Sequence, residues 1–238
     1  MRPIFAAMAM SETGFVLHSI PHRETSLIVE LFSQKLGRLA VVAKGARRPQ
    51  SALRAVLLQF QPIEFTLAGK GELRILTRAE WQGGLPMPGG EALLFAFYLN
   101  ELLVRLLMRE DPHPGLYDAY VQALRAFAER GAREEVLRRF EWLLLQEIGY
   151  APDLSCDQHG RQLQPGAEYR MHGGQLVLSD AADEDAFSGR VLQDIAGGRY
   201  DAPGALASAK RLSRQVLGVQ LEGIPLKTRQ ILIDLQRL

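Results

Sequence analysis

The sequence contains a single cysteine, Cys156, among 238 residues. An internal disulfide is therefore excluded, and this cysteine usage is typical of a reducing compartment. No apolar run approaches the roughly 20 residues that a membrane-spanning helix needs. The start of the chain, MRPIFAAMAMSETG, also lacks the full apolar segment and the cleavage site of a signal peptide. We therefore expect a cytoplasmic protein.

Enzyme signatures are absent as well. The sequence has no GxxxxGK[ST] phosphate loop, no HExxH motif and no GxSxG motif. The Gly-Lys-Gly at 69–71 fits a hairpin turn better than a phosphate cradle. His18 and His22 have no cysteine or serine arranged as a nucleophile beside them, and histidines near strands are more often structural. We expect a protein without catalytic activity.

The net charge of +1 hides an uneven distribution of charge along the chain. Residues 1–82 hold 11 Lys and Arg against 6 Asp and Glu, residues 83–200 hold 11 against 18, and residues 201–238 hold 6 against 3. Two basic segments therefore flank an acidic middle. This pattern favours an anionic partner, although scattered solvated charge is an alternative that the counts leave open.

Short apolar runs follow one another near the start of the chain. Each is bounded by proline or glycine, and the runs are too short and too rich in β-branched residues for helices. They are Gly14–Ser19, Leu27–Phe32 and Leu39–Ala43, and the glycines at 69 and 71 mark a tight hairpin into a last strand, Leu73–Trp81. Five strands fit before residue 82, which predicts a small five-stranded oligonucleotide-binding (OB) barrel.

After Trp81 the period of the apolar residues changes from two to about 3.6, across a segment rich in glycine and proline. Helices are predicted over Glu91–Met108, Leu116–Glu129, Glu134–Ile148, Arg190–Ile195, Pro203–Leu217 and Leu226–Leu238. A polar, turn-rich stretch interrupts them and contains a predicted hairpin over Glu168–Ser179 with two glycines at its tip. The fold class is thus α+β. Its predicted parts are a barrel domain (1–82), a linker (83–89), a helical domain (90–149 and 186–238) and an insert (150–185).

A basic loop after the third predicted strand is the leading candidate for nucleic-acid binding. A protein that follows a flexible phosphate backbone needs cations at phosphate spacing beside a β-surface. An ordinary solvated surface loop is the alternative. The loop cations are Lys44, Arg47, Arg48 and Arg54, and Arg38, Lys70 and Arg74 from neighbouring strands or turns could extend the same face. The phenylalanines of this region, at positions 15, 32, 60 and 65, sit in apolar runs. We therefore expect phosphate contacts rather than base stacking, and little sequence preference.

Two further groups of residues leave alternatives open. Lys210, Arg211 and Arg214 lie in one predicted helix and Lys227 and Arg229 begin the next, where cations are either structural or available to a ligand. In the predicted helix 134–148, Leu137, Phe140, Leu144 and Ile148 form an apolar stripe flanked by Arg138 and Arg139. Core packing explains the stripe. A groove of this kind also suits a peptide that ends in an apolar residue and a free carboxylate.

The segment from Cys156 to His159 has the spacing of a zinc knuckle, and His172 lies where a second ligand pair is expected. One cysteine and two histidines provide three ligands, whereas structural zinc sites are almost always four-coordinate. We expect a degenerate finger that is held by packing rather than by a metal.

Five blocks of the sequence, in the same order, resemble the bacterial RecO family of DNA repair and recombination-mediator proteins. The blocks are FVLHSIPHRETSLIVELF, GRLAVVAKGARR, YLNELLVRLL, LRRFEWLLLQEIGY, and AKRLSRQVL followed by LEGIPLKTRQIL. Together they cover nearly the whole chain. The resemblance implies a non-enzymatic protein of the RecF pathway that binds single- and double-stranded DNA and anneals complementary strands.

The resemblance also implies partners and roles for particular residues. It implies binding to RecR, docking on the C-terminal tail of single-stranded DNA-binding protein (SSB), and help in loading RecA. Because the family docks this acidic, phenylalanine-terminated tail on its helical domain, Arg138 is expected as the anchor and Arg139 as the second contact. The LKTR-type block favours a DNA or partner role for Lys227 and Arg229. Zinc-bearing relatives use four cysteines in the insert, whereas this chain keeps one.

The combined prediction is a DNA-annealing recombination mediator without a cofactor, located in the cytoplasm with the nucleoid. Cationic surfaces would neutralise two phosphate backbones, and the helical domain would tether the protein to coated single strands. The alternative is an interaction adaptor whose barrel binds protein and whose DNA contacts are incidental. A steep salt dependence of DNA affinity separates these two functions.

Overall fold

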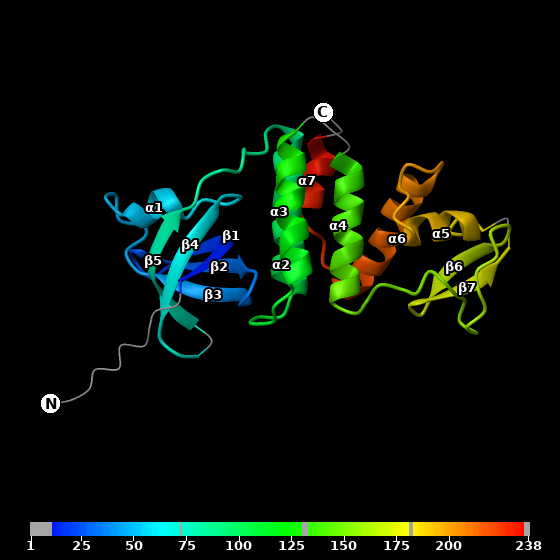
Figure 1. Ribbon diagram of the computed structural model, residues 1–238, viewed down its shortest axis with the longest axis horizontal. Coiled ribbons are helices and arrows are strands. Elements are labelled where there is room, and N and C mark those ends of the chain that lie inside the picture. Colours follow the sequence, from blue (N-terminus) through cyan, green and yellow to red (C-terminus); the bar gives the residue numbers. More distant parts are fainter. Residues whose placement is uncertain (1–10, 72, 130–132, 181–182, 236–238) are drawn as a thin grey trace. The chain divides into compact units, whose positions relative to one another are not determined.

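The computed structural model describes residues 11–71, 73–129, 133–180 and 183–235 (Figure 1). Its first part is a closed barrel in which the strands are hydrogen-bonded in the order β1-β2-β3-β5-β4. The strands are β1 (Ser11–His22), β2 (Ser26–Ser33), β3 (Gly37–Ala43), β4 (Pro62–Ala68) and β5 (Leu73–Trp81). All neighbours are antiparallel except β3 and β5, which are parallel. The predicted five-stranded barrel is therefore confirmed.

Every second side chain along the strands points inward and fills the barrel. In β2 and β3, Val29, Leu31, Leu39 and Val41 point inward and are at most 2% exposed. Their β-branched and leucine side chains suit the narrow interior of a small barrel. A short helix, α1 (Ala52–Val56), follows the basic loop and packs partly buried side chains against this core. Helix α1 was not anticipated from the sequence, because five residues give too short a pattern.

The outer face of the barrel is covered at one end by aromatic side chains of helix α3 (Pro114–Ala128). Phe15 and Phe32 lie outside the core cluster of the barrel and contact Tyr117 and Tyr120, with ring centroids 5.3–5.9 Å apart. Burial raises the pKa of Tyr117 to about 12, with a further contribution from the carboxylate of Glu12. These rings dock the barrel on α3, since each buried aromatic removes 150–250 Å² of surface from water.

A carboxylate holds the loop after helix α2 (Glu91–Leu106) against the barrel. Glu30 accepts from Arg38 at 2.9 Å and from Arg109 at 2.5 Å. The same Arg38 donates to the carbonyl of Leu107 at 3.0 Å. At the start of β3 the backbone lies so close to that of the α2–α3 loop that a Cβ on Gly37 would overlap with Asp111. The barrel and the α2–α3 pair are thus joined by fixed polar contacts.

The chain forms two compact units, residues 1–130 with 226–238, and residues 131–225. In the first unit α2 and α3 run side by side, and the last helix, α7 (Lys227–Leu235), packs against α2 (Figure 1). The carboxylate of Glu101 accepts hydrogen bonds from the backbone amides of Lys227 and Thr228, both at 2.9 Å. Burial acts to raise the pKa of Glu101, but these hydrogen bonds outweigh it and lower the pKa. Glu101 therefore caps the last helix.

The second unit combines three helices with a small sheet. Helix α4 contacts α6, which also contacts α5, and the sheet has the strand order β7-β6-β8. The elements are α4 (Arg133–Glu147), β6 (Glu168–His172), β7 (Gln175–Ser179), β8 (Phe187–Ser188), α5 (Gly189–Ala196) and α6 (Ala205–Gln220). The predicted hairpin with glycines at its tip is confirmed. The two-residue strand β8 was not anticipated.

The predicted helices are all present, with ends that shift by a few residues. Helix α3 begins at Pro114, where proline suits the first turn, and α6 begins after Gly204 rather than at Pro203. Positions 236–238 of the last predicted helix lie outside the described residues. The domain bounds from composition stay a prediction. No helix in the described parts of the chain is long and apolar enough to span a membrane.

The close approach at Gly37 gives a stability prediction. Its φ of +68° and the overlap with Asp111 both oppose a side chain. Left-handed backbone costs an L-residue about 1–2 kcal/mol, and overpacking adds about 1–3 kcal/mol. We expect Gly37→Ala to lower the free energy of unfolding by about 3 kcal/mol in urea titrations. Gly69→Ala is the matched control, because its φ is +94° but nothing lies within 4 Å of the added Cβ. Equal losses for the two variants would show that the contact with Asp111 is unimportant.

Candidate nucleic-acid interface

The basic loop runs from Lys44 to Ser51 between β3 and α1. Its turns are closed by backbone hydrogen bonds, including that from the Arg48 amide to the carbonyl of Gly45 at 3.0 Å. Gly45 has a φ of +69°, which glycine adopts without strain. The backbone of the loop is therefore fixed, while its long side chains are exposed.

Arg47 ties this loop to the turn between β1 and β2. Its amide donates to the carbonyl of Thr25 at 2.9 Å, and its guanidinium donates to the carbonyls of Arg23 at 3.4 Å and Glu24 at 3.2 Å. Arg47 thus has a structural role in addition to its charge. The role predicted for it as a phosphate contact stays a prediction.

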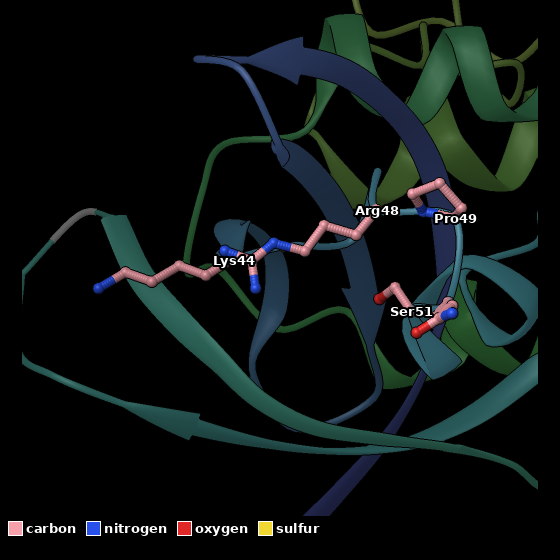
Figure 2. A pocket seen from close by; sticks show the side chains of 6 residues that line it. Lys44, Arg48, Pro49 and Ser51 are labelled. Atoms are coloured by element: carbon pink, nitrogen blue, oxygen red, sulfur yellow. The ribbon is translucent and has the colours of Figure 1, made fainter.

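Lys44 and Arg48 are placed differently. Among the described residues, neither side chain has a hydrogen-bond or ion-pair partner, and both are exposed. Figure 2 shows the two side chains extending in the same direction, away from Pro49 and Ser51. They line an open hollow of about 650 Å³ together with Gly45 and Gln50. Two cations without internal partners on a rigid loop are able to bind an anion such as phosphate at little cost in reorganisation.

The other cations predicted on the barrel fall into two groups. Arg54 and Lys70 are exposed and, within the described residues, have no ion-pair partner. Arg38 is held by Glu30 and Leu107, and Arg74 is paired with Glu110 at 2.6 Å. Arg38 and Arg74 are therefore engaged in the contact between the barrel and the α2–α3 loop. The sequence could not reveal their partners, since Glu110 lies 36 residues from Arg74.

The second basic group is also largely engaged. Arg211 donates to the carbonyls of Glu184 and Ala186 and lies 4.0 Å above the ring of Phe187. Lys210 lies 3.5 Å from Glu134, and Arg214 has an interaction partner as well. These three cations belong to the second unit. Lys227 and Arg229 are exposed in the first unit, and their predicted role stays a prediction.

The phenylalanines and the tryptophan of the barrel region differ in their exposure. Phe15, Phe32, Phe60 and Phe65 are at most 2% exposed, as expected from their apolar runs. Among the described residues of the barrel region, Trp81 is an exposed aromatic: it is 61% exposed and donates its indole N–H to Gln61 at 3.1 Å. Trp81 was predicted only as the end of the last strand, although a tryptophan at such a position beside a glycine-rich linker is a recognisable signal.

The residues predicted to bind the SSB tail lie on α4. Leu137 and Phe140 are 5% and 2% exposed, so they pack in the core. Arg138 is 7% exposed and lies 2.8 Å from Glu141, which is fully buried. The Nε of Arg138 is buried without an acceptor among the described residues. Arg139 is exposed, donates to Glu135 and to the carbonyl of Gly198, and lies 4.9 Å above the ring of Tyr200.

The insert contains two carboxylates that fold its turns. Asp153 accepts from the amide and hydroxyl of Ser155 and from the thiol of Cys156 at 3.2 Å, and these bonds lower its pKa. The hydrogen bond to Asp153 in turn raises the pKa of Cys156. Asp157 accepts from the amides of His159 and Arg161 at 2.8 and 3.0 Å. The turns of the knuckle are thus closed by aspartates. An aspartate whose side chain accepts from the amide two residues later is a known turn signal in sequences.

The donor set of the insert does not fit a structural zinc ion. Within the described residues, no group of three or more His, Cys, Asp or Glu side chains is placed to hold a metal. His159 and His172 are both exposed, and the thiol of Cys156 is bonded to Asp153.

The two units have net charges of opposite sign. The first unit contains 18 Lys and Arg against 13 Asp and Glu, and the second contains 10 against 14. The unit that carries the barrel therefore has the positive net charge and the other unit the negative one. The closed five-stranded barrel places the first unit in the OB-type class of small barrels.

Comparison with known proteins identifies the family. The model of the recombination protein O N-terminal domain matches residues 8–84, and that of the C-terminal domain matches residues 87–230. Similar curated proteins, all described as DNA repair protein RecO, come from Ralstonia nicotianae (47% identity, 95% of this chain and 85% of the relative), Azoarcus sp. (47%, 95% and 96%) and Aromatoleum aromaticum (45%, 95% and 96%). The chain belongs to the RecO family.

The insert gives a prediction about metal. Because aspartates close its turns, we expect a chelator to leave the melting temperature unchanged and Cys156→Ser to be tolerated. A structural zinc ion contributes on the order of 10 kcal/mol in small finger peptides, so its loss would be evident. Asp157→Asn is the contrasting variant, since it weakens two turn hydrogen bonds and should lower the melting temperature. Stoichiometric zinc in the purified protein would refute this interpretation.

Proposed function

We propose that this protein binds single- and double-stranded DNA through the basic loop of its barrel and acts, without catalysis, in DNA repair and homologous recombination. The observation that carries the proposal is the pair Lys44 and Arg48, exposed on a fixed loop without partners among the described residues. Membership of the RecO family supports the repair role. Arg54 and Lys70 extend the positive surface of the same unit.

The proposed mechanism of annealing is electrostatic. Two DNA strands repel each other through their phosphates, and a cationic surface that binds both lowers this repulsion. The first unit has a net charge of +5, and Lys44 and Arg48 of its barrel loop line an open hollow. Such a surface allows strands to slide and pair, because phosphate contacts carry no sequence information.

We further propose that the second unit binds the acidic tail of SSB, which is the partner that the family resemblance implies. Binding to the tail would raise the local concentration of the protein on coated strands, where it would act with RecR to help load RecA. Arg138 is the proposed anchor because its buried Nε has no acceptor among the described residues. Leu137 and Phe140 support the helix from within the core rather than contact the tail directly. The proposed location is the cytoplasm, with the nucleoid.

A second candidate function is an interaction adaptor whose barrel binds protein. It is favoured by the engagement of Arg38 and Arg74 in internal ion pairs, which leaves fewer cations for DNA than the sequence suggests. The two functions predict different responses to salt, because counterion release makes DNA affinity fall steeply with salt concentration.

The first prediction concerns the loop. We expect Lys44→Ala/Arg48→Ala to weaken binding of all DNA sequences alike and to flatten the salt dependence. Each lost phosphate contact reduces the slope of log affinity against log salt by about 0.7 for single strands, so the double variant should lose about 1.4. Fluorescence anisotropy at several salt concentrations measures this slope.

Arg161→Ala/Arg199→Ala is the matched control, since it removes the same charge from the second unit. We expect it to leave the slope unchanged. An unchanged slope in the loop variant would move the DNA site elsewhere, and a shallow slope in the wild type would favour the adaptor.

The next prediction concerns the tail anchor. Charge-assisted hydrogen bonds contribute roughly 1.5–3 kcal/mol, so Arg138→Ala should weaken binding of a tail peptide by roughly ten- to a hundredfold in titration calorimetry. Binding to naked single-stranded DNA should stay as in the wild type, because the loop is intact.

Folding must be separated from binding in this test, because Arg138→Ala leaves Glu141 buried without its ion-pair partner. The double variant Arg138→Gln/Glu141→Gln removes both charges together and should lose the peptide while melting near the wild type. Equal peptide affinity in this variant and the wild type would show that Arg138 is not the anchor.

A further inference from the structure

A row of aliphatic side chains crosses four neighbouring strands of the barrel. Ile20 in β1 is paired with Ile28 in β2, Ile28 is paired with Val42 in β3, and Val42 is paired with Ile75 in β5. Side chains directly opposite each other on neighbouring strands point to the same face of a sheet. The four residues, named here the aliphatic row, therefore form one continuous strip.

The aliphatic row faces away from the barrel core. The adjacent residues Val29, Val41 and Leu76 are buried in the core, and alternation along each strand places the row on the opposite face. Ile20 is 46% exposed, and the other three side chains are half-buried. Apolar residues at all four positions are unusual for an outer face, where polar residues normally alternate with the core. The row is thus a partly exposed apolar strip on the outer face of the barrel.

The row lies next to the unpartnered cations of the basic loop. Val42 precedes Lys44 by two positions, a separation of about 7 Å along an extended strand. Ile20 and Ile28 flank the β1–β2 turn, to which Arg47 fastens the same loop. An apolar strip edged by lysine and arginine complements a ligand with flat apolar faces and a chain of negative charges. Single-stranded nucleic acid has this chemistry, with base faces beside phosphates.

We propose that the aliphatic row contacts the faces of unpaired bases and thereby makes the protein prefer single-stranded over double-stranded DNA. This inference rests on the proposed function of the basic loop. In a duplex the base faces are stacked on each other, so a duplex offers the loop its phosphates but offers the row nothing. The row spans about 14 Å across four strands, which accommodates a few bases. Branched aliphatic side chains accept any base, because they make no hydrogen bonds.

The experiment compares three DNA probes of equal length: a thymidine oligomer, an abasic oligomer with the same phosphates, and a duplex. The variant is Ile28→Thr/Val42→Thr, which keeps β-branched side chains but removes apolar surface. We expect its affinity for the thymidine oligomer to fall roughly tenfold, while its affinities for the abasic oligomer and the duplex stay as in the wild type. The salt slope should not change, because no cation is removed.

Leu178→Thr is the matched control, since Leu178 is a 63% exposed strand residue of the second unit. It should bind all three probes like the wild type. The proposal is overturned if the row variant binds the thymidine oligomer with wild-type affinity, or if it loses affinity for the abasic oligomer to the same extent. Failure of the proposed function itself looks different, because then Lys44→Ala/Arg48→Ala also leaves the affinity for every probe unchanged.

A second measurement needs no substitution in the row. The methyl resonances of Ile20, Ile28 and Ile75 should shift when the thymidine oligomer is added, because bases over these side chains impose ring-current shifts. The abasic oligomer should leave them in place. Equal shifts with both oligomers, or no shift with either, would overturn the proposal even if the double variant fails to fold.

Discussion

Glu30 is the residue on which the assembly of the first unit depends. Its carboxylate is largely buried on the outer face of the barrel, and it accepts from Arg38 and Arg109. Arg38 comes from the barrel itself and Arg109 from the loop after α2, so one carboxylate joins the barrel to that loop. Arg38 adds a bond to the carbonyl of Leu107, so the end of α2 is fixed by the same network. The barrel is thereby fixed to α2 and the loop that follows it.

This anchoring divides the basic residues of the chain into two kinds. Some arginines bind backbone carbonyls or internal carboxylates, as Arg211 does with the segment before β8 and Arg74 does with Glu110. Others, such as Arg48, have no such partner among the described residues. The guanidinium group serves both purposes because it has five donors in a rigid plane. A count of positive charges therefore overstates the surface that is available to an anion.

Local patterns were enough to predict four strands of the barrel and the helices, because each element repeats its apolar period over many residues, whereas β4 was counted but not located. The runs around Val29 and Val41 are examples, and so is the glycine-tipped hairpin of the insert. Helix α1 and strand β8 were missed, because segments of five and two residues are too short to show an apolar period. The candidate site was predicted only as a set of basic residues, and the sequence could not tell that Arg38 is held from a loop 69 residues away. The aliphatic row was missed for a related reason, since its four members meet only through strand register.

The path of the chain between the units has a consequence for synthesis. Helix α7 belongs to the first unit, although the whole second unit precedes it in the sequence. As the chain leaves the ribosome, the barrel, α2 and α3 emerge first, and the second unit can fold before residues 226–235 appear. Until then the carboxylate of Glu101 has no helix end to cap, and the face of α2 that α7 covers remains in contact with water. The first unit is therefore the first to start folding and the last to finish.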